Sequence, residues 1–173
     1  GGKVVLKAEP AVSCAITWTS DTTSVATVDS NGVVTGVAPG DAIITATYNG
    51  ATAVATIKVL EPVIEISIDG ASGTQNGISQ GATLTSTVKV DGVEITGAAK
   101  ESGIAWTSSD TTVATVDPKT GKVNVLVNQK EFRITVTYTY TYNTGSGTKN
   151  VSKSDSARYK QTLSTPIQPS KRP

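Results

Sequence analysis

ITWTSDTTSVATVD occupies residues 16–29, and IAWTSSDTTVATVD occupies residues 104–117. Ten of these fourteen positions are identical, at a spacing of 88 residues. A turn sequence follows each copy, Ser30-Asn31-Gly32 in the first and Pro118-Lys119-Thr120-Gly121 in the second. Asn and Gly tolerate a positive φ and Pro presets the first turn position, so both stretches predict a tight reversal. The repeat within 173 residues predicts two domains.

The composition around the repeat favours β-structure. Aromatic residues make up only 5% of the chain, the apolar residues are mostly Val, Ile and Ala, and Thr is abundant. Branched side chains suit pleated surfaces and resist helix. Period-2 alternation predicts strands near residues 3–8, 15–19, 25–28, 33–35, 42–48 and 53–59, and then near 64–68, 82–90, 93–96, 104–107, 113–116, 122–127, 132–142 and 150–159.

Short strands at regular spacing predict an all-β fold with two tandem sandwiches. Asn49-Gly50 and Asp91-Gly92 are two-residue hairpin signals. The polar strand near residues 150–159 is expected at a sheet edge, protected by Lys153 and Arg158. The predicted boundaries are a first domain at 1–60, a second domain with extended hairpins at 61–161, and a basic, Pro-containing tail or linker at 162–173.

Charge and cysteine content exclude several classes of protein. The net charge is −1 over residues 1–60, −3 over 61–148 and +5 over 149–173. The basic residues of the last segment are not interleaved with aromatics, so no nucleic-acid surface is expected. Cys14 is the only cysteine, which excludes an intrachain disulfide, and we interpret it as a small apolar residue.

Four stretches of the first domain follow one another in a recognisable order: ITWTS at 16–20, SVATVD at 24–29, NGVVTGVAPG at 31–40 and AIITAT at 42–47. With them the first domain resembles the group-2 bacterial immunoglobulin-like domains of intimin- and invasin-type proteins. The second domain shares Trp106, the VATVD sequence at 113–117 and Gly121, and then departs from the pattern at 125–129, which read VLVNQ.

This resemblance implies a structural or adhesive module on the bacterial cell surface, acting as a spacer or binding platform. One alternative is an outward-facing component of a phage capsid or tail. Another is a carbohydrate-binding accessory module of a larger secreted enzyme. The expected partners are a protein or glycan ligand, neighbouring copies or virion proteins, without membrane insertion of this segment. The family pattern has a strand before the position of Gly1, so the first domain is expected to be short of it, through truncation or because a neighbouring chain supplies it.

Candidate chemistry is sparse. The chain has no His, so neither a Ser-His-Asp triad nor a Cys-His pair can form, and one Cys without His is no usual zinc set. We therefore expect no enzyme and no cofactor. Calcium is the remaining metal, although Asp is also common in turns because its side chain bonds the nearby backbone. The aspartates near predicted turns are Asp21, Asp29, Asp41, Asp110, Asp117 and Asp155.

Two groups of side chains are assigned to core and contact roles. Both tryptophans lie in predicted strands, where sandwiches bury an aromatic, so we expect packing rather than sugar stacking. The predicted core includes Trp18, Trp106, Ile16, Ile104, Val28 and Val116. The predicted contact surface lies on the last long hairpin, where Tyr142 borders a glycine-rich loop, and includes Lys149 and Arg158.

Overall fold

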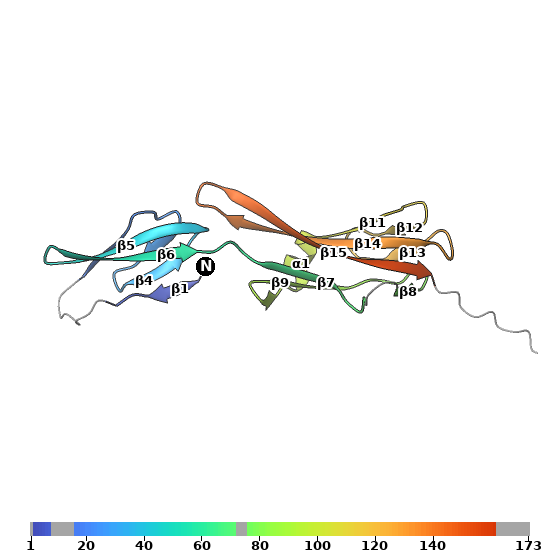
Figure 1. Ribbon diagram of the computed structural model, residues 1–173, viewed down its shortest axis with the longest axis horizontal. Coiled ribbons are helices and arrows are strands. Elements are labelled where there is room, and N and C mark those ends of the chain that lie inside the picture. Colours follow the sequence, from blue (N-terminus) through green and yellow to red (C-terminus); the bar gives the residue numbers. More distant parts are fainter. Residues whose placement is uncertain (1, 8–15, 72–75, 162–173) are drawn as a thin grey trace, which may run out of the picture. The chain divides into compact units, whose positions relative to one another are not determined.

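The computed structural model describes residues 2–7, 16–71 and 76–161, and the chain divides into two compact units (Figure 1). Unit 1 contains Gly1–Pro62 together with Thr141–Val151. Unit 2 contains Val63–Tyr140 together with Ser152–Pro173. The hairpin tip at Thr141–Val151, which the sequence places in the second domain, thus groups with unit 1. Cys14 and the tail at 162–173 lie outside the described residues.

Unit 1 has two antiparallel three-stranded sheets, ordered β1-β4-β3 and β2-β5-β6. Asn49 and Gly50 join β5 to β6 with φ of 47° and 79°, as a two-residue hairpin turn requires. The strands are β1 (Lys3–Val5), β2 (Thr17–Ser20), β3 (Ala26–Val28), β4 (Val33–Gly36), β5 (Gly40–Tyr48) and β6 (Ala51–Val59).

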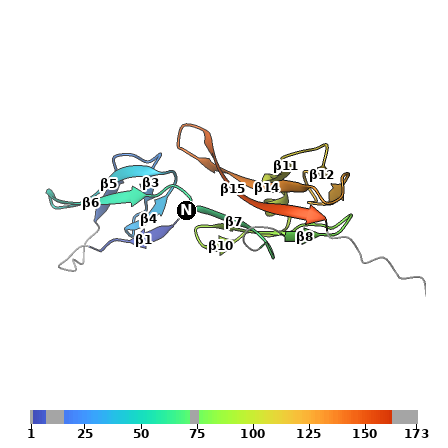
Figure 2. The same cartoon turned by 45° about the vertical axis from the view of Figure 1, so that its right-hand side comes forward.

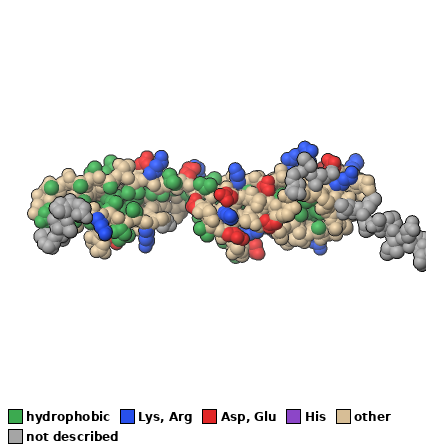
Figure 3. Space-filling view, turned by 60° about the horizontal axis from the view of Figure 1, so that its bottom comes forward, with side chains coloured by type: hydrophobic (Ala, Val, Ile, Leu, Met, Phe, Trp, Pro, Cys, Tyr) green, Lys and Arg blue, Asp and Glu red, His purple; other side chains and the backbone are tan. Residues whose placement is uncertain are grey.

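The core of unit 1 follows from alternation along β5. Ala42, Ile44 and Ala46 are buried. Ala42 and Ile44 form a cluster with Ala26 and Val34 from the other sheet. Trp18, Val28 and Ile57 pack against this cluster but are only partly buried. Hydrophobic side chains also show on the surface of this unit (Figure 3), with Val5, Val54 and Leu60 more than half exposed.

Unit 2 contains a three-stranded sheet ordered β10-β9-β7, a four-stranded sheet ordered β11-β14-β15-β8, and the β12-β13 pair (Figure 2). A single bridge between Thr83 and Lys122 links the segment before β9 to the segment before β13. The elements are β7 (Ile64–Ile68), β8 (Asn76–Ile78), β9 (Ser86–Val90), β10 (Val93–Glu94), α1 (Gly97–Gly103), β11 (Ile104–Ser108), β12 (Ala114–Val116), β13 (Val123–Val125), β14 (Glu131–Asn143) and β15 (Thr148–Gln161).

The core of unit 2 is larger and better covered. Phe132, Ile134, Val136 and Tyr138 alternate along β14 and are all buried, and Trp106 is only 4% exposed. Burying each such side chain contributes about 1.5–3 kcal/mol relative to leaving it in water. Among the predicted core residues, Ile104 is buried like Trp106, whereas Ile16, Val28 and Val116 are partly exposed.

The structure confirms the all-β prediction of two immunoglobulin-like sandwiches and corrects three details. The sequence did not indicate β8 or the short helix α1. β15, expected at an edge, pairs in parallel with β8 at its end, through Tyr159–Gln161, while no strand of the described residues pairs with the outer side of its earlier part (Figures 1 and 2). The backbone carbonyl of Arg158 accepts a hydrogen bond from the Asn76 side-chain amide, 3.1 Å away, which helps to hold β8 in place.

Candidate binding surfaces

Two of the aspartates considered as calcium ligands hold turns. The Asp29 carboxylate accepts hydrogen bonds from the backbone N–H groups of Asn31 and Val33, at 2.8 and 3.0 Å. The Asp117 carboxylate accepts those of Lys119 and Thr120, at 2.9 and 2.7 Å. The backbone hydrogen bonds from Thr120 and Lys119 stabilise the ionised form and hold the Asp117 pKa below its usual value.

The Asp110 carboxylate is engaged in the same way. It accepts hydrogen bonds from the hydroxyl and the backbone N–H of Thr112, which lower its pKa. Asp41 lies exposed near the start of β5. Asp110 is thus a local support for its loop.

Two further aspartates join segments that are distant in sequence. Asp21 accepts the backbone N–H of Ile43 at 2.8 Å, and Asp155 accepts that of Ile68 at 2.8 Å. Within the described ranges, no group of three or more Asp, Glu or Cys side chains comes close enough to hold a metal ion. The predicted aspartates are therefore spread over separate structural positions.

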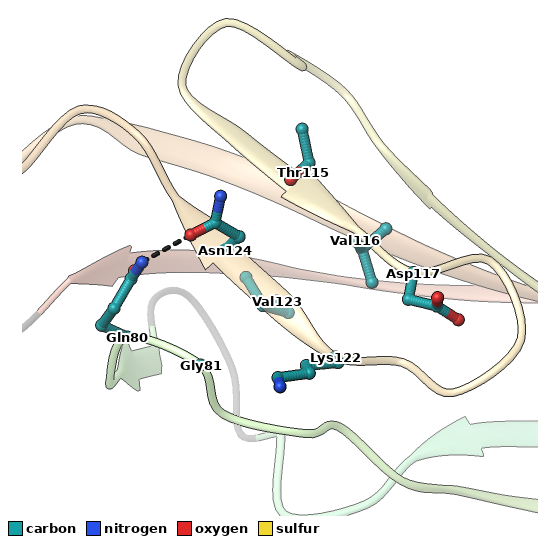
Figure 4. Close-up of a pocket in the computed structure, with 8 residues that line it drawn as sticks. All are labelled: Gln80, Gly81, Thr115, Val116, Asp117, Lys122, Val123 and Asn124. Atoms are coloured by element: carbon teal, nitrogen blue, oxygen red, sulfur yellow. Dashed lines mark hydrogen bonds between the residues drawn. The ribbon is translucent and has the colours of Figure 1, made fainter.

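An open hollow of about 560 Å³ lies beside the β12-β13 pair (Figure 4). Gln80 reaches across it, donating through Nε2 to the Asn124 side chain and accepting the Val125 backbone N–H at 2.8 Å. The charged side chains in its lining are Asp117 and Lys122. Both polar atoms of the Gln80 amide are hydrogen-bonded, and the lining carries one acidic and one basic side chain. These features indicate a structural role for the hollow rather than a catalytic one.

A second hollow, of about 300 Å³, lies over Trp106. Its two lysines are directed at backbone carbonyl groups: Lys100 donates to Ser86, and Lys119 donates to Ile104 at 3.3 Å. The Ser86 hydroxyl is buried beneath this rim. Both lysines are thus engaged with backbone carbonyl groups, and neither is presented as a nucleophile.

The β14-β15 ladder carries a hydroxyl-rich face in unit 2, on which the Arg133 guanidinium donates a hydrogen bond to the Ser156 hydroxyl at 3.2 Å. Thr137 and Ser154 lie 2.8 Å apart, oxygen to oxygen, and Thr139 and Ser152 lie 2.9 Å apart. These pairs satisfy one another across the two strands. The face therefore has polar atoms with few unused hydrogen-bonding groups.

The predicted contact residues near the hairpin tip are largely engaged in unit 1. Lys149 Nζ lies 2.7 Å from Glu61 Oε1 in an ion pair at the surface. The hydrogen bond and charge of Lys149 lower the Glu61 pKa, and those of Glu61 raise the Lys149 pKa. Tyr142 is partly buried, and its hydroxyl has no hydrogen-bond partner among the described residues. Arg158 is exposed, and a contact role for these residues stays a prediction.

Sequence reasoning missed Gln80 and Asn124. They are 44 residues apart, and neither lies in a motif, so only the folded structure brings them together. None of the described helices is long and apolar enough to cross a membrane.

Comparison with known families identifies the first sandwich. Residues 3–59 match the family model of the bacterial Ig-like domain (group 2). Residues 3–59 form a group 2 bacterial immunoglobulin-like domain. The resemblance drawn from the sequence is thus confirmed for this domain. Outside the matched range, Trp106 pairs with Val136 in unit 2 as Trp18 pairs with Ala46 in unit 1.

Individual proteins also match, and the chain spans about an eighth of the length of the curated relative. The chain is 32% identical over 110 residues to Ice-binding protein 1 of Shewanella frigidimarina (strain NCIMB 400), which covers 62% of this chain and 12% of that protein. Domains 1–6 of the surface layer protein SbsC are 25% identical, with a TM-score of 0.49, covering 89% of this chain and 21% of that one. Domains 4 and 5 of SbsC are 24% identical, with a TM-score of 0.46, and the match covers 93% of this chain and 80% of that one.

Proposed function

We propose that this chain is a non-catalytic structural and adhesive module of a surface-exposed bacterial protein, which spaces or presents other parts outside the cell. The observation that carries the proposal is the match of residues 3–59 to the bacterial immunoglobulin-like family. The chemistry of the described side chains supports it. The chain has no His, and carboxylates such as Asp29 and Asp117 accept hydrogen bonds from the backbone of their own turns.

The spacer role depends on two separate cores, one in each unit. A module of this kind works by keeping its shape, and any ligand would bind at loops or sheet edges, where side chains and backbone are accessible. The phage and carbohydrate-binding alternatives stay predictions from the sequence.

Surface location is the part of the proposal that can be tested first. Antibodies raised against this chain would be applied to intact and to broken cells of the source bacterium, with an antibody against a cytosolic protein as the control. We expect the chain to be labelled on intact cells and lost after mild external proteolysis. Labelling that appears only after the cells are broken would contradict the proposal.

A further inference from the structure

Two arginines of unit 2 lie opposite each other on the exposed face of the β14-β15 hairpin. Phe132 of β14 stacks on Tyr159 of β15, with ring centroids 6.2 Å apart, and both side chains are 3% exposed. Successive side chains alternate across a strand, so the neighbours Arg133 and Arg158 face the other way, where both are exposed. The hydroxyl pairs described above continue the same register along the two strands (Figure 1). Arg133 and Arg158 are therefore a cross-strand pair.

The backbone geometry brings this pair close together. The Arg133 carbonyl accepts the backbone N–H of Ser109 at 2.9 Å, on the β11 side of β14. The Arg158 carbonyl accepts the side-chain amide of Asn76 at 3.1 Å, on the β8 side of β15. The two backbones thus turn away from each other, which is the non-hydrogen-bonded arrangement, in which opposite side chains lie closer than in a hydrogen-bonded pair. The Cβ atoms of such a pair are about 4.5–5.5 Å apart.

The positive charge of this pair is not neutralised by a carboxylate. Within the described ranges neither guanidinium forms an ion pair, and that of Arg133 donates to the uncharged hydroxyl of Ser156 at 3.2 Å. The next pair on the same face, toward the strand ends, is Glu131 opposite Lys160, which adds no net charge. Like charges directly opposite each other destabilise a sheet. The pair therefore leaves two adjacent positive charges for an anion.

Unit 1 has a carboxylate at the place where unit 2 has a hydroxyl. The Asp21 carboxylate accepts the backbone N–H of Ile43 at 2.8 Å, and the Ser109 hydroxyl accepts that of Arg133 at 2.9 Å. The two bonds are equivalent, because Ile43 and Arg133 lie the same number of residues before the strand partner of the tryptophan in their units. Serine thus makes the bond that aspartate makes in unit 1, and it brings no negative charge to Arg133.

Arginine is the side chain that suits an oxyanion at this position. The chain has three arginines, at 133, 158 and 172, and two of them form this pair. A planar guanidinium binds a carboxylate or sulfate group through two parallel N–H bonds, whereas the ammonium of lysine acts as a point charge. Two guanidinium groups at this spacing are placed to hold one such group between them.

The surroundings of the pair indicate which class of anionic ligand fits. Thr137 and Ser154, and then Thr139 and Ser152, line the same face. Each pair of hydroxyls uses one O–H in the bond between its oxygens and keeps the other as a donor. Among the residues described on β14 and β15 of unit 2, this face has no aromatic side chain on which bases could stack, and no large apolar one to anchor a protein. A polymer with both hydroxyl and oxyanion groups is an acidic polysaccharide.

We propose that Arg133 and Arg158 bind an acidic polysaccharide and hold one of its carboxylate or sulfate groups between their guanidinium groups. The sugar hydroxyls meet the Thr and Ser hydroxyls alongside. The site lies on an exposed sheet face, which is accessible as loops and sheet edges are. This inference rests on the proposed adhesive function and deepens it, because it names the class of ligand and the place where the ligand binds. Exposed charges bind weakly one at a time, so modules that bind side by side on one polymer strengthen the attachment.

Three probes of matched length test the site: a galacturonate oligomer, a sulfated dextran oligomer and neutral dextran. Each would be titrated into the full chain labelled with ¹⁵N, while backbone amide and arginine Nε–H signals are followed by NMR. We expect saturable shifts at Arg133 and Arg158 with an acidic probe and none with neutral dextran. The two acidic probes decide between a carboxylate and a sulfate. The affinity should fall as salt is added, because the charges are at the surface.

Matched variants separate the arginine pair from the general charge of the chain. Arg133→Gln and Arg158→Gln should each lower the affinity about tenfold, the factor that one hydrogen bond to a charged group contributes. Lys153→Gln is the control, because Lys153 lies on β15 like Arg158 and its side chain leaves the opposite face. Ser109→Asp supplies the carboxylate that unit 1 has at this place, and it should also weaken binding. Circular dichroism checks that each variant folds.

Four results would overturn the proposal. Two of them are no binding of either acidic probe and equal binding of neutral dextran. The third is an equal loss of affinity in Lys153→Gln and Arg158→Gln, which would show that net charge alone attracts the polymer. The fourth is tighter binding of a single-stranded oligonucleotide than of both acidic probes, which would assign the face to nucleic acid.

The outcome is separate from that of the surface-location test. A chain that is labelled on intact cells and binds neither acidic probe keeps the spacer role and loses this site. A chain that binds an acidic probe through the arginine pair and is labelled only in broken cells keeps this site and loses the proposed location.

Discussion

Gly121 lies directly against the indole ring of Trp106. A Cβ atom at this position would come within 3.1 Å of Trp106 Cε2 and 2.5 Å of the Leu84 carbonyl oxygen, and the backbone φ is +71°. Gly32 has the same relation to Trp18, with a Cβ 2.9 Å from Cζ2 and a φ of +76°. The turn after each VATVD stretch therefore needs glycine both for its conformation and for its closeness to the tryptophan.

Substitution of Gly121 by alanine should destabilise unit 2 strongly. The positive φ costs about 1 kcal/mol, and the overlap with Trp106 and Leu84 adds about 1–3 kcal/mol. Gly92→Ala is the matched control, since Gly92 has a φ of +78° and nothing within 4 Å of a built Cβ. Chemical denaturation would measure both variants. Equal losses of stability would contradict a role for the tryptophan contact.

Removal of each tryptophan should have unequal effects. Trp106→Ala should cost about 3–5 kcal/mol, because it leaves a cavity in a closed core. Trp18→Ala should cost less, since Trp18 is partly exposed and its surroundings can relax toward solvent. Denaturation followed by circular dichroism would measure the loss, and the fluorescence of the remaining tryptophan would report on the other unit as an internal control. A larger loss for Trp18→Ala would show that the burial difference does not set stability.

Asp117 should make the stability of unit 2 depend on pH. Its pKa is lowered in the folded state by the N–H groups of Thr120 and Lys119, so its contribution is fully present above the ordinary carboxylate pKa. That contribution is lost as the pH falls through the lowered folded value. The difference in unfolding free energy between wild type and Asp117→Ala should therefore shrink on acidification below about pH 4. Asp41→Ala serves as the exposed control, and a difference that grows on acidification would contradict the assignment.

The hydrogen bond from Ile68 to Asp155 should matter because the donor is buried. Ile68 is 4% exposed, and Asp155→Ala would leave its backbone N–H without this acceptor, at a cost of about 1–3 kcal/mol. Hydrogen exchange at the Ile68 amide should accelerate, with the Ile66 amide as a nearby reference. Asp155→Asn, which keeps an oxygen acceptor, should recover part of the loss. If neither variant changes exchange at Ile68, this hydrogen bond contributes little to the stability of unit 2.

The sequence predicted the strands along which apolar and polar side chains alternate. Alternation located β7 at 64–68 to the residue and β14 to within one residue at each end. β8 was missed because its three residues, Asn-Gly-Ile, are too few to show a period. α1 was missed because seven residues without a side-chain cap give little helix signal.

The candidate surfaces were predictable only where the chemistry is local. The turn interpretation of Asp29 and Asp117 follows from residues two to four positions away, and the structure shows those bonds. The roles of Asp21, Asp155 and Gln80 depend on strands that meet across the fold, and single-sequence patterns carry no information about such meetings.

The shared register of Trp18 with Ala46 and of Trp106 with Val136 has a practical value for experiments. Each variant made in one copy has a twin in the other copy of the same molecule, under identical solvent, temperature and concentration. Because Trp18 is partly buried and Trp106 is only 4% exposed, twin variants at these two positions compare one strand register under two degrees of burial. The effect of burial can thus be measured inside a single polypeptide.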